Sequence, residues 1–138
     1  DYVFEWSRML SFDGNTAPYL QNAHARIRSI VRKAEGEGAR GDGQMNVVLA
    51  EPDERGLALE LLSFGNVIRS VEETLHPHKL CTYLFDLAAR FSTFYEKCPV
   101  LKAPTPELRT SRLILCDLTA KVLAGGLDLL GIEAPERM

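Results

Sequence analysis

The chain has 138 residues, of which 46% are hydrophobic and 25% charged, and its formal net charge is −3. This length suits one domain, and the composition is that of an ordinary soluble globular protein. No apolar run approaches the roughly 18–20 residues that a membrane span needs, and no basic leader precedes an apolar block. Because the chain as a whole is not a polycation, a nucleic-acid partner would need a local basic stripe.

The N-terminal segment "DYVFEWSRML" lacks an initiator Met and opens inside an amphipathic pattern. We therefore expect the chain to be part of a longer protein. Hydrophobic spacing of three and four residues dominates throughout, and alternation of period two is nearly absent. The spacing predicts an all-α protein folded as a compact bundle of four to five helices, with 46–50 as the only strand-like run.

The first half of the chain contains three predicted helices. The first covers about residues 2–10. The second starts with Thr16 as its N-cap, has Pro18 in its first turn, and keeps one apolar face from Leu20 to Ala34. The glycine-rich segment 36–44 then predicts a surface loop. The third helix begins near Pro52, bends or restarts at Gly65, and ends before "HPH" at 76–78.

The second half contains two long predicted helices. One covers 79–95, with a heptad-like seam formed by Leu80, Leu84, Leu87, Phe91 and Phe94. A proline-punctuated loop follows, and Thr105 or a neighbour caps the last helix. Its predicted apolar face comprises Leu108, Ser111, Leu115, Leu118, Val122, Gly125 and Leu129. The pair Gly125-Gly126 predicts close packing of a neighbouring element, and Gly131 is a natural C-cap.

The cysteines and histidines give no strong catalytic or metal signal. Cys81, Cys98 and Cys116 are an odd number for a disulfide framework and lie in apolar helical contexts, which favours reduced thiols in a cytosolic protein. A zinc site from His76, His78, Cys81 and Cys98 lacks the usual paired spacing, so a helix-capping loop is the simpler interpretation. Hydrolase, kinase and dinucleotide motifs are absent from the chain.

Basic residues gather on the second predicted helix. His24, Arg28 and Arg32 recur every four residues, and Arg26 and Lys33 follow on a neighbouring strip. This pattern is compatible with an ordinary solvated face, or with phosphate binding. A second basic group accompanies the last helix and the loop before it: Tyr95, Lys97, Lys102, Arg109, Arg112 and Lys121. An aromatic residue among cations is typical of proteins that stack an unpaired RNA base.

Three segments in order carry a resemblance to a known family. "FDGNTAPYLQNAHARIRSI" resembles the junction between the catalytic and C-terminal helical domains of arginyl-tRNA synthetases. "LCTYLFDLAARFSTFYEKCPVL" and "SRLILCDLTAKVLAGGLDLLGIEAPERM" are similar to the rest of that helical domain, the anticodon-binding module with the Asp-Ala-Leu-Arg signature. The ending "PERM" also resembles the C-terminus of the family.

The resemblance implies roles for individual positions. Tyr19 and Arg26 correspond to residues beside the catalytic pocket, near the acceptor end of the tRNA. Tyr95 and Met138 correspond to residues at the anticodon loop. We add Arg28, Arg109 and Arg112 from their charge and spacing, since cations there suit phosphate contact. Asn22 stands where the family pattern leads us to expect Tyr.

For the whole protein, the resemblance implies an arginine–tRNA ligase that uses ATP and Mg²⁺. Residues 1–14 would end the junction with the catalytic domain, and 15–138 would form the anticodon-binding domain. The two class I signatures are absent, as expected if they lie upstream, so this part alone would be inactive and bind no cofactor. Its partners would be arginine tRNA and its own catalytic domain, in a cytoplasmic, monomeric enzyme. The alternative is a free-standing helical module that binds RNA or protein.

Overall fold

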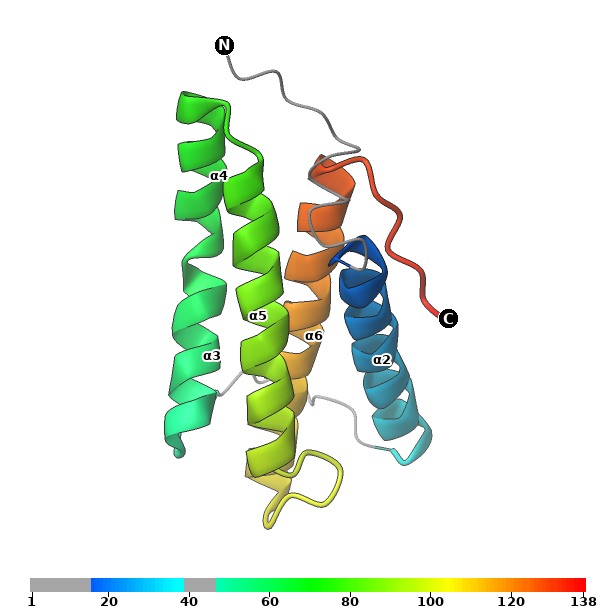
Figure 1. The fold of residues 1–138 in the computed structure, drawn as a ribbon. Coiled ribbons are helices and arrows are strands. Elements are labelled where there is room, and N and C mark those ends of the chain that lie inside the picture. The colour runs from blue at the N-terminus through cyan, green and yellow to red at the C-terminus, as the bar shows by residue number, and fades with distance from the viewer. Residues whose placement is uncertain (1–15, 39–46) are drawn as a thin grey trace.

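The computed structural model describes residues 16–38 and 47–138. Within these residues the secondary structure is entirely helical, as predicted, and five helices form a bundle (Figure 1). Their bounds are α2 Thr16–Gly36, α3 Pro52–Leu62, α4 Phe64–Thr74, α5 His78–Lys97 and α6 Pro106–Leu129. The helix expected at 2–10 and the domain boundary expected near residue 14 lie outside the described residues.

α2 follows its predicted apolar face closely. The helix already includes Thr16, which we expected to precede it as the cap. Leu20, Ile27 and Ala34 are almost completely buried, and α2 packs mainly against α6 and to a lesser extent against α5. The periodic apolar positions therefore decide which side of α2 faces the bundle.

α3 and α4 stack end to end and run antiparallel to α5 (Figure 1). The interruption falls at Ser63, two residues before the predicted position at Gly65. Ser63 stays in the right-handed region, with φ −75° and ψ −12°, and its hydroxyl donates to the Leu59 carbonyl. α4 ends at Thr74, and the next residue, Leu75, has a positive φ of 55° that turns the chain before the expected break at Pro77.

α5 confirms the predicted seam, because Leu80, Leu84, Leu87, Phe91 and Phe94 are all buried. α6 begins as predicted: the Thr105 hydroxyl accepts a hydrogen bond from the Leu108 N–H at 3.2 Å. At its other end, Gly131 adopts a positive φ of 74°, and the Ile132 N–H donates to the Leu127 carbonyl. This is the left-handed turn that commonly ends a helix.

The predicted apolar face of α6 was wrong for several positions. Leu118 and Leu129 are exposed, whereas Cys116, Thr119, Ala120, Leu123 and Leu127 are buried. α6 contacts α2, α3 and α5 at once, so its buried surface is wider than one leucine stripe. Small and polar side chains fill the closest contacts, and periodicity alone does not reveal them.

Gly126 makes the close approach predicted for the glycine pair. A Cβ added to Gly126 would lie 2.6 Å from Leu84 Cδ2, whereas one at Gly125 would meet only Phe64 Cζ at 3.9 Å. Leu84 is itself fully buried, so a shift of its side chain would disturb the surrounding core. Gly126 therefore sets the distance between α5 and α6.

We predict that Gly126→Ala destabilises the protein and that Gly125→Ala does not. Overpacking at Leu84 should outweigh the better helix propensity of Ala, for a net loss of about 1–2 kcal/mol. Gly125→Ala should instead gain up to about 1 kcal/mol. Urea unfolding of the two variants provides the measurement. Equal stabilisation by both substitutions would contradict the close packing at Gly126.

Candidate nucleic-acid interface

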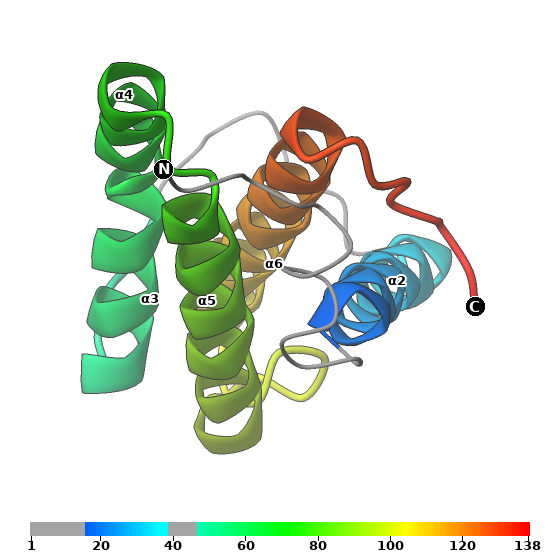
Figure 2. The same cartoon turned by 45° about the horizontal axis from the view of Figure 1, so that its top comes forward.

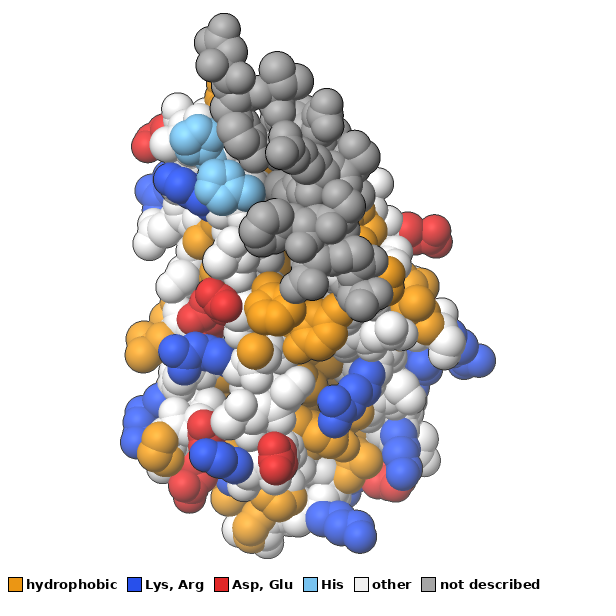
Figure 3. Space-filling model, in the orientation of Figure 1, with side chains coloured by type: hydrophobic (Ala, Val, Ile, Leu, Met, Phe, Trp, Pro, Cys, Tyr) orange, Lys and Arg blue, Asp and Glu red, His pale blue; other side chains and the backbone are white. Residues whose placement is uncertain are grey.

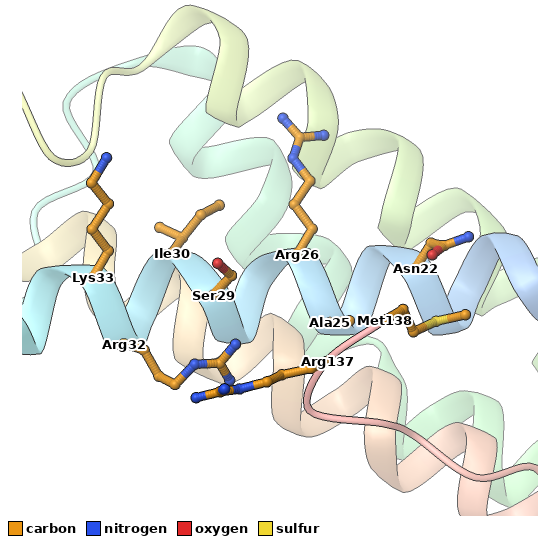
Figure 4. Close-up of a pocket in the computed structure, with 9 residues that line it drawn as sticks. All are labelled: Asn22, Ala25, Arg26, Ser29, Ile30, Arg32, Lys33, Arg137 and Met138. Carbon is orange, nitrogen blue, oxygen red and sulfur yellow. The ribbon is translucent and has the colours of Figure 1, made fainter.

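An open groove of about 970 Å³ lies on the exposed side of α2 (Figure 4). Its lining comes from α2 and from the end of the chain and includes Asn22, Arg26, Ser29, Arg32, Lys33, Arg137 and Met138. Asn22, Arg26, Ser29 and Lys33 are exposed and spaced by four, three and four residues, so they form one stripe along the helix. We call these four residues the open stripe.

Arg26 connects the groove to α5. Its guanidinium lies over the ring of Tyr95, 5.2 Å from the ring centroid. The Tyr95 ring also stacks against Phe91, with centroids 5.9 Å apart, so the aromatic ring is held from within the bundle. Figure 4 shows Arg26 pointing away from α2 toward the neighbouring helix. A guanidinium over a supported aromatic ring offers a flat, positively charged surface to a nucleic-acid base.

Three cations near this groove are not committed to acidic partners. Within the described residues, no ion pair involves Arg26, Lys33 or Arg137. The face in Figure 3 shows Lys and Arg side chains around exposed hydrophobic side chains between the lower parts of α5 and α2. Cations without acidic partners remain available to phosphate groups.

The predicted cationic face of His24, Arg28 and Arg32 does not point freely into solvent. It lies under the C-terminal segment that follows α6. His24 is only 3% exposed, and its Nδ1 lies 2.9 Å from the Pro135 carbonyl oxygen. Because a carbonyl can only accept, Nδ1 is the donor. Arg28 and Arg32 both bond the Glu136 carboxylate, and Arg28 also bonds Asp117.

Arg109 and Arg112 also have intramolecular partners. Arg109 forms an ion pair with Glu37 at 3.0 Å. Arg112 is 4% exposed, donates to the Pro99 carbonyl at 2.8 Å, and lies 3.4 Å from the Glu54 carboxylate, which is completely buried. Arg112 thus ties α6 to α3 and to the loop after α5. A guanidinium in this position has no surface for a phosphate.

The structure therefore brings together three of the seven predicted tRNA-binding residues: Arg26, Tyr95 and Met138. Our sequence interpretation had separated Arg26 from the other two. Tyr19 lies elsewhere, at the start of α2, where its ring is 5.1 Å from that of Phe85. Arg28, Arg109 and Arg112 are engaged within the protein. Helical spacing indicates Lys33 as a basic residue of α2, but no local pattern indicates Arg137 or Glu136.

The cysteines and histidines are not arranged as a site. Burial raises the pKa of all three thiols, and that of Cys116 to about 12. His76 and His78 neighbour each other at the start of α5, whereas Cys98 follows its far end. Among the residues described, no cluster of His, Cys, Asp or Glu could hold a metal ion. The described helices also include none with the length and apolarity to cross a membrane.

Comparison with known proteins identifies the class. Residues 20–138 match the DALR anticodon binding domain. The chain therefore belongs to this family of helical anticodon-binding domains.

Particular relatives are arginine–tRNA ligases. The chain is 56% identical to the ligase of Thermobifida fusca over 138 residues, which is all of this chain and 24% of that protein. It is 57% identical to the ligase of Frankia casuarinae, matching 23% of that protein. The arginyl-tRNA synthetase structure from Thermus thermophilus superposes with a TM-score of 0.77 at 45% identity, over 94% of this chain and 22% of that one. The chain thus spans about a quarter of the length of these relatives.

We predict that Arg112 is required for stability. Arg112→Leu leaves the Glu54 carboxylate buried without its cation, which should cost about 3–5 kcal/mol. Arg109→Leu removes only a partly exposed pair and should cost at most about 1 kcal/mol. Denaturant unfolding compares the two variants. If Arg112→Leu were no more destabilising than Arg109→Leu, the assignment of Arg112 to a structural role would be wrong.

Proposed function

We propose that this chain binds the anticodon loop of arginine tRNA in the groove beside α2. The supporting observation is the juxtaposition of Arg26 and Tyr95, with Met138 lining the same groove. Single-stranded RNA is bound by flat side chains that stack on unpaired bases and by cations that contact phosphates. The stacked pair of Arg26 and Tyr95 supplies the flat surface, and Arg26, Lys33 and Arg137 supply the cations.

The proposal extends to the protein from which the chain derives. Its relatives carry the name arginine–tRNA ligase and are about four times longer than this chain. We propose that the remaining part joins arginine to tRNA with ATP and Mg²⁺, and that this domain orients the tRNA. The parent gene tests this point: codons upstream of Asp1 must encode the two nucleotide-binding signatures of class I synthetases.

The structure changes our expectation for Arg26. The sequence interpretation placed Arg26 near the acceptor end, so only the intact enzyme should respond to its loss. Its position over Tyr95 instead supports a role in the same groove. Asn22 lines this groove one helical turn earlier, so the unusual residue at that position belongs to the same surface. A shorter amide there makes the groove wider than Tyr would.

We predict that Tyr95→Ala weakens binding of an arginine tRNA anticodon stem-loop by about 5- to 150-fold, because base stacking contributes about 1–3 kcal/mol. Tyr95→Phe keeps the ring and should bind nearly as well as the wild type. Fluorescence titration measures both, and circular dichroism confirms folding. Unchanged affinity for Tyr95→Ala would refute the stacking role.

We predict that Arg26→Gln also weakens binding of the isolated stem-loop, and makes the remaining affinity less sensitive to salt. The loss of one phosphate-contacting cation should reduce the slope of log K against log salt by about 0.7. Arg69→Gln is the matched control, because Arg69 is on α4 and, among the described residues, its side chain bonds only Asn66. If Arg26→Gln behaved like Arg69→Gln with the stem-loop, Arg26 would not belong to this interface.

A further inference from the structure

The segment after α6 runs along the outer side of α2 (Figure 2). Four α2 side chains hold it. Gln21 Nε2 donates to the Glu133 carbonyl at 2.9 Å, and His24 Nδ1 to the Pro135 carbonyl at 2.9 Å. Arg28 Nε bonds the Glu136 carboxylate at 3.1 Å, and Arg32 Nη1 bonds the Glu136 carbonyl at 3.1 Å. We call Gln21, His24, Arg28 and Arg32 the clamp.

The clamp is a second stripe of α2, distinct from the open stripe. Its residues are spaced by three, four and four, so they share one side of the helix. We call residues 130–138, which follow α6, the tail. Three partners of the clamp are main-chain carbonyl oxygens of the tail, so the clamp fixes the course of its main chain. Ile132 and Ala134 pack partly against the core and fix the same path from the other side. Glu136 is the one tail side chain that the clamp holds.

A residue of α6 also contacts Arg28, which bonds Glu136. Arg28 Nη1 lies 3.1 Å from Asp117, which also pairs with Lys121 at 2.8 Å. Arg32 adds a second contact to the Glu136 carboxylate at 3.3 Å. These alternating charges form one network in which Arg28 is only 25% exposed. A network of this kind holds its members more firmly than an isolated surface pair.

The next two residues are the ones that reach the groove. Arg137 and Met138 line it, and in Figure 4 they lie on the side of α2 that carries Arg32. Met138 is 69% exposed, and no hydrogen bond or ion pair holds Arg137 or Met138 within the part of the chain described. Their position therefore depends on the last anchored residue, Glu136. While Glu136 is held, the two residues after it keep the chain end within roughly 7 Å of that anchor.

We propose that the clamp positions the chain end as a preformed wall of the RNA groove, with Arg28 and Arg32 acting through Glu136. This inference rests on the proposed function. Arg28 and Arg32 are then positioning residues that do not contact phosphate. Holding Arg137 and Met138 before RNA arrives reduces the ordering cost of binding.

A competing arrangement predicts the opposite change in RNA affinity when Glu136 is removed. If Arg28 and Arg32 instead contacted phosphates, Glu136 would compete with RNA, and its removal would strengthen binding. If they position the tail, removal of Glu136 weakens binding. Glu35→Ala controls for the lost negative charge, because Glu35 is exposed on α2 and its side chain has no bonded partner in the described structure.

The test is stem-loop binding by Glu136→Ala and Glu35→Ala chains. Relative to Glu35→Ala, Glu136→Ala should raise Kd by about 2- to 10-fold, as expected when one or two side chains lose their ordering. In a Met138→Ala background, most of this difference should disappear, because the clamp acts through the chain end. Equal or tighter binding by Glu136→Ala would overturn the proposal.

A second readout needs no RNA. The chain has three methionines, so methyl-labelled methionine NMR gives a simple spectrum in which Met138→Leu assigns the terminal signal. In free Glu136→Ala, this signal should sharpen and move toward its random-coil position, while Glu35→Ala leaves it in place. An unchanged Met138 signal in Glu136→Ala would overturn the clamp. So would a mobile Met138 methyl group in a Glu136→Ala chain that binds the stem-loop as tightly as before. If Tyr95→Ala and Met138→Ala also bind the stem-loop normally, the proposed function fails. If these two variants bind more weakly but Glu136→Ala binds normally, only the clamp is refuted.

Discussion

Through its buried side chains, including Leu20, Ile27 and Ala34, α2 packs against α6 and α5, and this contact sets the direction of its other side chains. Two stripes remain outside the bundle. One, with Arg28 and Arg32, lies under the tail that follows α6, and the other, with Arg26, faces open space. The proposed RNA surface depends on this division. Arg28 and Arg32 have acidic partners, whereas Arg26 on the other stripe has none among the described residues.

One end of the bundle is held by polar contacts made by the first turns of α6. Arg112 joins Glu54 in α3 to the loop after α5, and the Ser111 hydroxyl exchanges hydrogen bonds with the main chain of Val48. These contacts involve side chains that look like surface residues in the sequence. They tie α6 to α3 and to the loop that follows α5, close to Tyr95 in the sequence. The groove is thus built on packed helices, which hold side chains more rigidly than loops do.

Much of the fold followed from local chemistry. The seam of α5, the Thr105 cap, the turn at Gly131 and the close approach at Gly126 were all predicted, because each depends on a short pattern of side chains. The face of α6 was predicted poorly, since α6 touches three neighbours and buries Cys116 and Thr119 while leaving Leu118 exposed. The break between α3 and α4 was predicted at Gly65, but it lies two residues earlier, at Ser63, whose hydroxyl bonds the main chain of α3.

By itself, the sequence determined an all-α chain, the core-facing residues of α2 and α5, and a resemblance to the anticodon-binding family. Only the tertiary structure decided which cations are available for RNA. Arg26 and Arg28 are both arginines of the same helix, and each belongs to a row of cations at helical spacing. Yet Arg26 lies over Tyr95, whereas Arg28 pairs with Glu136, 108 positions along the chain. Such partners are chosen by packing between distant segments, and a local pattern carries no information about them.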